Sequence, residues 1–568
     1  MSIASKRRYV VAAAAIVAGA LMLSGCGSSN DGGGNASEKP SDGSTSSALE
    51  GLNLQSRDNI KEGGSLTTGT VEISAQFNTF HGDGTKYTLD FWRWYNPQLA
   101  LYDADGTYHF NTDFLTDVKQ EVKDGNTVVT YTINPKAQYN DGTPIDWKSF
   151  EATWKSNNGS DENFVSSNTD GYSKITSVTM GADERQAVVT YDGIYAWVNA
   201  LFENIINPEA AKDAETYNTA YIENPHPEWG AGPYTVDKYD KNNGTISFKR
   251  NDAWWGDKGM LDTRTFRALE DSAEINAFKN GELDAAGVGN KDRLAQVKDM
   301  DGIEIREAGT PSNSLMMLNS ADPVLGDLEV RTAIMKGIDR SVIAKIRFQG
   351  MDYTEPLPGS FAQYSFQPDY TDNFAESGLD YDKEAAAKIL DDAGWKAGSD
   401  GIREKDGKKL SFVFTTLGDN EISASQAKAI NSMLKEIGVD AAINNRPSSD
   451  FSDVYTNREF GMFLMGFSSS NPYGFGDFCQ VYCSDSQLNL SGTGTPEIDE
   501  KVKEVGAIAD PDEQIKAGNK LEAEIFKETA GIMPLYNGPT MVAMKKGLAN
   551  YGAGQFYVGK VQDIGWQK

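Results

Sequence analysis

Residues 318–340 read LNSADPVLGDLEVRTAIMKGIDR and lie in the middle of the 568-residue chain. Within this stretch we expect Arg331 and Asp339 to cap or bridge helix ends, because charged side chains can satisfy the backbone groups that a helix leaves free at its termini. A scaffold role is therefore expected for both residues, rather than contact with a ligand.

Segments on either side of this stretch alternate between strand and helix patterns. Residues 127–133 are β-branched with period two, which places alternate apolar side chains on one face of a strand. Residues 382–393 carry apolar positions at intervals of three and four, and Gly394 ends this helix. A later helix begins with Asp510 as its N-cap and Pro511 at its first position. The sequence therefore predicts mixed α/β or α+β lobes.

The N-terminal residues resemble the signal peptide of a bacterial lipoprotein. Basic residues at 6–8 precede an apolar run at 10–23, which has the length of a signal-peptide core and is too short for a comfortable membrane span. The sequence LSGC then resembles a lipobox, in which the cysteine is lipidated and becomes the first mature residue. We expect residues 1–25 to be the signal peptide and Cys26 to be the lipidation site, which would hold the protein on the extracellular face of the cell membrane. The alternative is an ordinary signal peptide with Cys26 incidental.

The composition of the remaining residues indicates a tether, the number of lobes and the kinds of partner that are excluded. Residues 26–62 are rich in Ser, Gly, Asn and Asp and are expected to form a disordered tether after the lipidated cysteine. About 505 residues follow, too many for one core, so two or three lobes are expected. The net charge is −29, from 53 Lys and Arg against 82 Asp and Glu. This acidity argues against nucleic acid as a partner, because phosphate binding needs a basic surface.

Signals of catalysis or metal binding are few. The three histidines have no partner at metal-ligand spacing, and we find no G-x-S-x-G elbow, P-loop or dinucleotide-binding fingerprint. We therefore expect no catalytic residues, no metal and no cofactor, which favours binding over catalysis.

The remaining cysteines, Cys479 and Cys483, are close in sequence. In an oxidising compartment this favours a local disulfide, and two free thiols are the alternative. A zinc site is not expected, because two cysteines without a nearby histidine supply too few ligands.

Several motifs resemble the extracellular solute-binding proteins of ABC importers, specifically family 5, the oligopeptide and dipeptide binders. The most specific is the stretch at 318–340, which is close to the family pattern FN…VRxAxxxAIDR. The others are KEGGSLT at 61–67, YNDGTPI at 139–145, GAGPY at 230–234, RNDAWWG at 250–256, GELD at 281–284 and MPLY at 533–536. The resemblance rests on their shared order and spacing, since any one of them could arise by chance.

The resemblance implies an α/β (mixed α+β), three-lobed periplasmic-binding-protein-like fold of the class II type, with a hinged cleft between lobes. Lobe I would hold residues 63–99, 221–315 and 533–568, lobe II residues 100–220, and lobe III residues 316–532. The crossovers between lobes can act as a hinge. A ligand that touches lobes I and III would shift the population toward the closed form.

The resemblance also implies which residues hold the ligand. In the family, the main chain of an extended peptide pairs with a segment after the first strand and with a loop late in lobe III. Here these are QFNTF at 76–80 and GFSSSNPY at 466–473. The ligand-binding candidates are Phe77, Asn78, Phe80, Phe467, Ser468, Ser470, Asn471, Tyr473, Asp477, Tyr536 and Asn537, and Trp92, Trp94 and Phe475 are further candidates for pocket walls.

The loop late in lobe III departs from the family pattern GWxxDYxDP, whose first Asp pairs with the α-ammonium group of the peptide. This chain has Phe467 in place of the Trp and Ser470 in place of that Asp. Asp477 lies nearby and could substitute. If no acidic residue takes this role, neutral dipoles must hold the N-terminus of the peptide, or the ligand carries no α-ammonium group. A Cys479–Cys483 bridge would either preorganise this loop or only stabilise it.

The resemblance implies a monomeric, lipid-anchored protein that captures oligopeptides and delivers them to ABC permease subunits with cytoplasmic ATPases. An oligosaccharide carrier is the alternative within the family, and nickel or a nickel chelate is less expected with three histidines. An extracellular lipid-anchored hydrolase is the alternative from another class.

Overall fold

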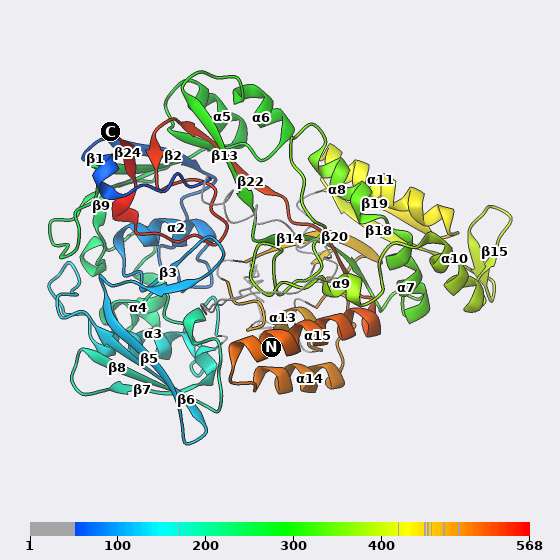
Figure 1. The fold of residues 1–568 in the computed structure, drawn as a ribbon, viewed down its shortest axis with the longest axis horizontal. Coiled ribbons are helices and arrows are strands. Elements are labelled where there is room, and N and C mark those ends of the chain that lie inside the picture. Colours follow the sequence, from blue (N-terminus) through cyan, green and yellow to red (C-terminus); the bar gives the residue numbers. More distant parts are fainter. Residues whose placement is uncertain are drawn as a thin grey trace, which may run out of the picture.

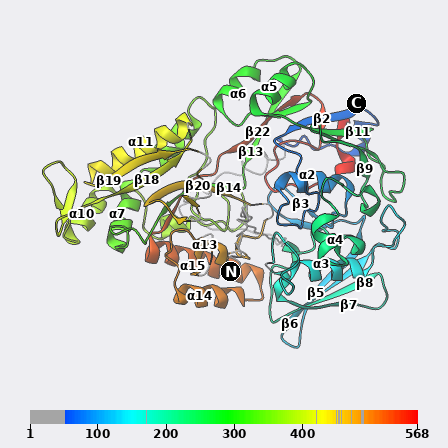
Figure 2. The same cartoon turned by 180° about the vertical axis from the view of Figure 1, so that it is seen from behind.

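The computed structural model describes residues 51–568, apart from 170, 419, 448–449, 451–453, 456, 470–471, 477, 485 and 487–488. The described residues form a mixed α/β fold around three large sheets (Figure 1). We call the parts around the seven-, four- and five-stranded sheets lobe I, lobe II and lobe III; their exact boundaries remain a prediction. Lobes I and II lie on one side of the molecule and lobe III on the other, as both views show (Figures 1 and 2). No helix in the described part has the length and apolar character needed to cross a membrane.

Lobe I is built on a mixed sheet with the strand order β13-β22-β12-β2-β11-β10-β9. The strands are β2 (Ser65–Thr70), β9 (Tyr234–Asp240), β10 (Thr245–Arg250), β11 (Thr263–Ala268), β12 (Ala285–Gly287), β13 (Ile303–Gly309) and β22 (Pro539–Lys545). β2 runs parallel to its neighbours β11 and β12, and the other pairs are antiparallel. Helix α2 (Lys86–Tyr95) packs Phe91 against Phe266 of β11, with ring centres 4.9 Å apart. Helices α5 (Asp271–Lys279) and α6 (Lys291–Val297) complete this lobe.

The two ends of the described chain meet at one edge of lobe I. β1 (Ile60–Lys61), β24 (Gly565–Gln567) and β23 (Leu548–Ala549) form a small sheet in the order β1-β24-β23. Just before it, the carbonyl groups of residues 51–53 accept hydrogen bonds from backbone N–H groups of residues 550–553 over 3.1–3.2 Å. The start of the described chain is therefore bound to the C-terminal segment, and the disordered tether predicted for residues 26–62 does not extend over residues 51–61.

Lobe II contains an antiparallel sheet in the order β5-β6-β8-β7. Its strands are β5 (Leu115–Lys123), β6 (Asn126–Ile133), β7 (Ile175–Met180) and β8 (Gln186–Tyr191), preceded by the hairpin β3 (Ala100–Tyr102) and β4 (Tyr108–Phe110). The period-two prediction for residues 127–133 is confirmed, because Val129, Tyr131 and Ile133 are all buried. Helices α3 (Trp147–Asn157) and α4 (Ala214–Thr219) belong to this part of the chain, and Phe150 of α3 packs against Tyr131.

Lobe III holds a sheet in the order β19-β18-β20-β14-β21. Its strands are β14 (Ser312–Leu318), β18 (Ser411–Leu417), β19 (Asp440–Arg446), β20 (Met462–Ser468) and β21 (Ile532–Tyr536). Its helices include α7 (Leu328–Gly337), α8 (Arg340–Phe348), α9 (Asn373–Glu376), α10 (Lys383–Asp392), α11 (Glu421–Glu436), α13 (Phe478–Tyr482), α14 (Pro496–Gly506) and α15 (Pro511–Thr529). A small sheet of β15 (Lys396–Ala397), β16 (Arg403–Lys405) and β17 (Lys408–Lys409) lies at its outer end (Figure 1).

The stretch at 318–340 joins β14 to α7 and α8, and its two charged residues act on helix ends as predicted. The Arg331 guanidinium donates to the carbonyl of Thr529, the last residue of α15, at 2.8 Å. The Asp339 carboxylate accepts the N–H of Ser341 at 2.9 Å and so caps α8. The N-cap predicted at Asp510 is also present. Local patterns thus position the helices that cover the lobe III sheet.

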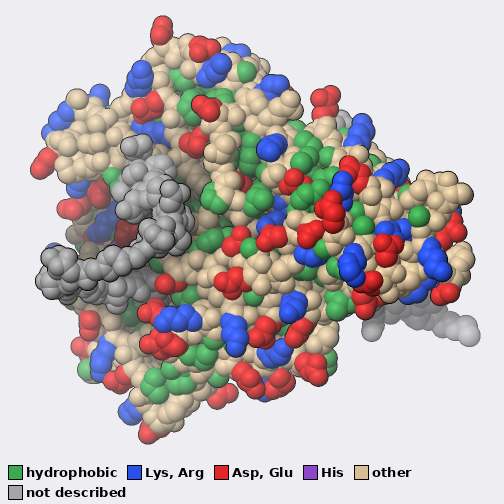
Figure 3. Space-filling model, turned by 45° about the vertical axis from the view of Figure 1, so that its right-hand side comes forward, with side chains coloured by type: hydrophobic (Ala, Val, Ile, Leu, Met, Phe, Trp, Pro, Cys, Tyr) green, Lys and Arg blue, Asp and Glu red, His purple; other side chains and the backbone are tan. Residues whose placement is uncertain are grey.

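Acidic and basic side chains are interspersed over the face of the molecule shown in Figure 3. With 82 acidic against 53 basic residues in the chain, the surface charge is predominantly negative.

Candidate functional site

Two short connections join lobe I to lobe III. One leads from β13 to β14 through residues 310–311, and the other leads from β21 to β22 through Asn537 and Gly538. The connections lie side by side, because the Thr310 N–H donates to the carbonyl of Gly538 at 3.0 Å and the Thr310 and Thr540 hydroxyls are 2.9 Å apart. Gly538 adopts a φ of +92°, a backbone conformation that residues with a Cβ atom rarely adopt. This paired crossover has the form of a hinge.

A single lobe III carboxylate holds the second connection. Glu355 accepts the backbone N–H of Asn537 at 2.8 Å and that of Gly538 at 2.9 Å, while the Tyr353 hydroxyl donates to it at 2.8 Å. Burial raises the pKa of Glu355, although these three donors favour its charged form. The loop that carries Tyr353 and Glu355 is thereby bound to the hinge.

A cavity of about 430 Å³, which we call the hinge cavity, opens beside this junction. It is bounded by β13, by residues 353–356, by Phe366 and by Asn537. The cavity therefore lies between the two lobes that the hinge joins.

A second cavity of about 430 Å³, the α2 cavity, lies in lobe I. Its walls are the end of β2, one face of α2, Thr540 of β22 and the C-terminal segment 550–561. The charged residues that line it are Lys86, Asp90, Arg93, Arg264 and Lys560, and the aromatic ones are Tyr87, Trp94, Phe266, Tyr551 and Tyr557. Gln555 lines both cavities, so they adjoin.

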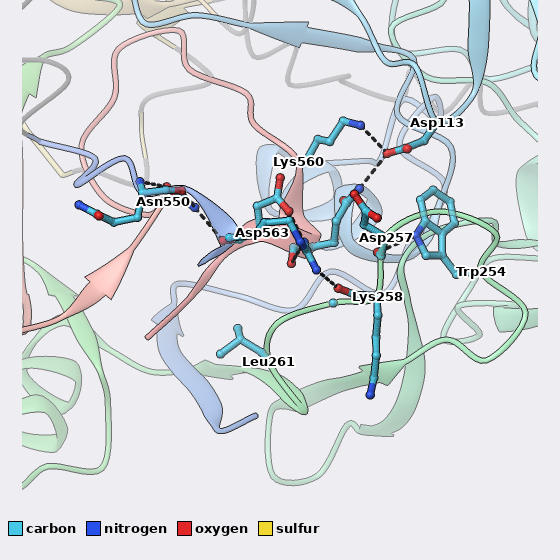
Figure 4. A network of polar contacts seen from close by, with 12 residues as sticks. Asp113, Trp254, Asp257, Lys258, Leu261, Asn550, Lys560 and Asp563 are labelled. Atoms are coloured by element: carbon cyan, nitrogen blue, oxygen red, sulfur yellow. Dashed lines mark hydrogen bonds and ion pairs between the residues drawn. The ribbon is translucent and has the colours of Figure 1, made fainter. Parts of the chain in front are cut away.

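The C-terminal segment that covers the α2 cavity is fastened to lobes I and II (Figure 4). The Lys560 ammonium lies 2.9 Å from the carboxylate of Asp113 in lobe II, and the Gln562 amide donates to the same carboxylate at 2.8 Å. Asn550 donates to the carbonyl of Asp563 at 2.8 Å, and the Asp563 carboxylate pairs with Arg57. This wall of the cavity is therefore held by contacts to both lobes I and II.

The candidates that follow β2 lie in packed surroundings. Phe77 is 1% exposed, and its ring centre is 5.0 Å from that of Tyr239. Asn78 is 0% exposed, and its amide donates to the Tyr217 carbonyl at 3.2 Å. Phe80 is half-buried. None of these three candidates lines the hinge cavity or the α2 cavity, and contact with a ligand remains a prediction for them.

Four candidates of lobe III gather at the start of β14. The Ser312 hydroxyl donates to the carbonyl of Phe467 at 2.9 Å and accepts a hydrogen bond from the Ser468 hydroxyl at 3.2 Å. Asn537 donates to the Ser312 carbonyl at 2.7 Å, and Tyr536 ends the neighbouring strand β21. Asn537 lines the hinge cavity. The structure thus brings these residues together beside the hinge.

The loop after β20 packs against lobe II. The Tyr473 ring centre lies 6.1 Å from those of Tyr102 and Trp197. Tyr102 also donates its hydroxyl to the Glu203 carboxylate at 2.9 Å, and burial raises the pKa of Glu203 to about 7, although Arg93 favours its charged form. Lobes II and III are therefore in contact, with the half-buried carboxyl group of Glu203 at the junction.

A second contact closes lobe III against lobe I. The ring centre of Phe556 in the C-terminal segment is 5.8 Å from those of Tyr364 and Phe366 in lobe III. The Tyr364 hydroxyl lies 2.6 Å from the hydroxyl of Ser469, which follows β20. The described conformation is therefore one in which the lobes touch.

Cys479 and Cys483 are joined by a disulfide with an S–S distance of 1.99 Å. The bridge spans α13, next to the Tyr473 loop. Ser470, Asn471 and Asp477 of this region lie outside the described residues, as does Cys26.

The sequence analysis missed Asp90, Arg93 and Glu355. The α2 residues carried a usable signal, since Lys86, Asp90 and Arg93 recur at intervals of four and three and share one face of a helix whose other residues are largely aromatic. Glu355 carried no such signal, because the two hinge N–H groups that it accepts are 182 and 183 positions away in the chain. Within the described ranges, no three His, Cys, Asp or Glu side chains are grouped to hold a metal ion.

Comparison with known proteins agrees with this architecture. The family model described as "Bacterial extracellular solute-binding proteins, family 5 Middle" matches residues 96–488. The oligopeptide-binding protein OppA of Mycobacterium tuberculosis is 32% identical over 517 residues, which cover 88% of this chain and 84% of the relative. The nickel-binding periplasmic protein of Escherichia coli is 24% identical over 481 residues, covering 80% of this chain and 86% of that protein.

Solved structures show the same fold. The periplasmic EDTA-binding protein EppA superimposes with a TM-score of 0.81 at 20% identity, covering 92% of this chain and 99% of that one. The oligopeptide-binding protein AppA of Bacillus subtilis, solved with a nonapeptide, gives a TM-score of 0.69 at 19% identity and covers 90% and 100% of the two chains. The sheets, the paired crossover and these matches lead to one conclusion: the chain belongs to family 5 of the bacterial extracellular solute-binding proteins.

Proposed function

We propose that this chain is the lipid-anchored, substrate-binding component of an ABC importer and that it captures oligopeptides by closing lobe III onto lobe I. The paired crossover carries the proposal, because two adjacent short connections permit rotation of one lobe against the other while limiting other motions. The identity of 32% to an OppA protein supports a peptide as the solute.

In this proposal the ligand lies between the hinge cavity and the α2 cavity and touches both lobes. Backbone groups around Ser312 and Asn537 pair with the main chain of the peptide, which is independent of its sequence. Because the ligand makes contacts to both lobes only in the closed form, its binding shifts the population toward closure. No bond of the ligand is made or broken.

The proposal places the protein on the outer face of the membrane through Cys26, as a monomer that hands its ligand to a permease with cytoplasmic ATPases. A tether that keeps the binder near the permease raises its effective concentration there. Metabolic labelling with a clickable fatty acid tests the anchor: label is expected on the natural protein and absent from Cys26→Ser. Equal labelling of both would contradict lipidation at this residue.

Mass spectrometry of molecules released from the purified protein by denaturation tests the ligand class. Intact peptides of varied sequence are expected. Release of oligosaccharides would replace the peptide assignment by the sugar alternative. A second measurement incubates the protein with a defined peptide pool and looks for cleavage; new fragments would contradict a carrier and support a hydrolase.

Small-angle X-ray scattering tests closure. We expect the radius of gyration to be larger for the protein freed of ligand than for the protein with the peptides that it retains. An unchanged profile would contradict capture by closure.

A further inference from the structure

One carboxylate in the α2 cavity has no partner in the described part of the chain. Asp90 lines this cavity from the middle of α2, and none of the described residues donates a hydrogen bond to it or forms an ion pair with it. Burial raises the pKa of Asp90, even though the charges of Lys86, Arg93 and Arg264 favour its ionised form. Asp90 is half-buried and lines the cavity, so a cationic hydrogen-bond donor that enters the cavity would supply the partner that the described residues do not provide.

The neighbouring cationic side chains do not donate hydrogen bonds to Asp90. Arg264 donates instead to the carbonyl groups of Leu66 and Thr265 and to the Thr68 hydroxyl. The Lys86 ammonium lies over the Tyr87 ring at 4.0 Å from its centre. Arg93 has a buried Nε without a hydrogen-bond partner in the described structure. The cavity therefore presents an acceptor at Asp90 and, one helical turn further, a donor at Arg93.

We propose that Asp90 anchors the α-ammonium group of a bound peptide, with Arg93 placed to receive the first peptide carbonyl; this inference rests on the proposed function. An N-terminal residue carries an ammonium donor and, three bonds away, a carbonyl oxygen acceptor, which matches an acid and a base one helical turn apart. A lysine side chain offers the ammonium without that carbonyl. A C-terminal carboxylate would meet Arg93 but would bring no charge to compensate Asp90.

The site belongs to lobe I and to the C-terminal segment that lines the same cavity. Asp90 lies on the same helix as Phe91 and Trp92, which are 1% exposed in the core, so the carboxylate is held in place before a ligand arrives. A fixed anchor for the terminus sets the register of the peptide, while the remaining contacts can stay independent of sequence.

Binding to chemically modified peptides tests the inference. The purified full-length protein, dialysed free of ligand, is first incubated with a peptide pool from a Glu-C digest of casein, and one retained lysine-containing peptide is synthesised. Four versions of it are compared by calorimetry: free, N-acetylated, C-amidated, and with norleucine in place of lysine. Each is titrated into the natural protein, into Asp90→Asn and into the control Asp237→Asn. Asp237 is an acid on β9 that pairs with Lys249 at 3.1 Å at the surface of the same lobe.

We expect N-acetylation to weaken binding to the natural protein and to Asp237→Asn by about 10- to 100-fold, and C-amidation and norleucine to change it by less than about threefold. In Asp90→Asn the free and acetylated peptides should bind alike. The affinity ratio of free to N-acetylated peptide is measured within each protein. A variant that folds incompletely would bind fewer peptide molecules, but this ratio would stay the same.

Three results overturn the inference. If N-acetylation leaves the affinity unchanged, or if C-amidation or norleucine weakens it instead, the α-ammonium is not held at Asp90, although capture of peptides would still stand. If the difference between free and acetylated peptide persists in Asp90→Asn, another acid is the anchor. If the natural protein retains no peptide from the pool, the proposed function itself fails.

Discussion

The Glu355 carboxylate of lobe III accepts the backbone N–H of Asn537 at 2.8 Å and thereby binds a loop of one lobe to the connection that leads into the other. Its second oxygen accepts the N–H of Gly538, so both N–H groups of this two-residue link end on one side chain. The relationship makes the geometry of the hinge depend on a residue that belongs to neither strand of the crossover.

Replacing Glu355 by Gln should therefore destabilise the protein. Glutamine keeps one acceptor but turns an NH₂ group toward a backbone donor, and we expect a loss of about 1–2 kcal/mol in the free energy of unfolding. Urea unfolding followed by tryptophan fluorescence measures it. Glu376→Gln, at an exposed position of α9, serves as the control with an expected change below about 0.5 kcal/mol. Equal stabilities of the two variants would show that the hinge contact is not needed.

Glu203 should make stability depend on pH. Burial raises its pKa to about 7, so between the unfolded value and 7 the folded protein binds more protons than the unfolded chain. The free energy of unfolding should then fall as pH rises from about 5 to 8, and Glu203→Gln should remove that part of the fall. Thermal unfolding of both proteins across this range provides the comparison. Parallel curves for the natural protein and the variant would contradict the assignment.

Glu522 should be the most sensitive acid of lobe III. It is 0% exposed and accepts hydrogen bonds from the hydroxyls of Ser360 and Tyr482, the amide of Asn373 and the N–H of Phe361, over 2.6–2.9 Å. Glu522→Ala leaves these donors without an acceptor and should cost on the order of 3 kcal/mol.

The free energies of unfolding of Glu522→Ala and of the control Glu524→Ala are compared by urea unfolding. Glu524 lies on the same helix, 44% exposed, with Lys501 at 3.7 Å. Its loss should cost less than about 0.5 kcal/mol. A similar cost for both substitutions would argue against a central role of the buried network.

The Cys479–Cys483 bridge closes a short loop and should contribute modestly. For a sequence separation of four, the loss of chain entropy in the unfolded state corresponds to roughly 2 kcal/mol. Cys479→Ser/Cys483→Ser should therefore unfold at lower urea concentration than the natural protein. Under a reducing agent the natural protein should approach the variant, and no effect of reduction on the natural protein would contradict a stabilising bridge.

Local patterns in the sequence predicted local structure well. The strand at 127–133, the N-cap Asp510 and the helix-end roles of Arg331 and Asp339 depend on neighbours within a few positions or on family motifs, and the structure confirms each of them. The family resemblance is likewise confirmed.

The residues of the candidate site were predicted less well from the sequence. The roles of Asp90 and Glu355 follow from what surrounds them, and these surroundings come from segments far away in the chain. A charged residue on an amphipathic helix is ordinarily solvated, so only the covering segment 550–561 makes Asp90 unusual. The side chains of Phe77 and Asn78 are buried, and their position after a strand did not indicate this; ligand contact by this segment stays a prediction.

The backbone pairing of residues 51–53 with residues 550–553 has a mechanical consequence. Any pull on the chain ahead of Gly51 is borne by the edge of lobe I and is not transmitted across the crossover. In the proposed mechanism, lobe I would therefore be the anchored lobe and lobe III the one that moves, and closure would not load the attachment of the chain to the membrane.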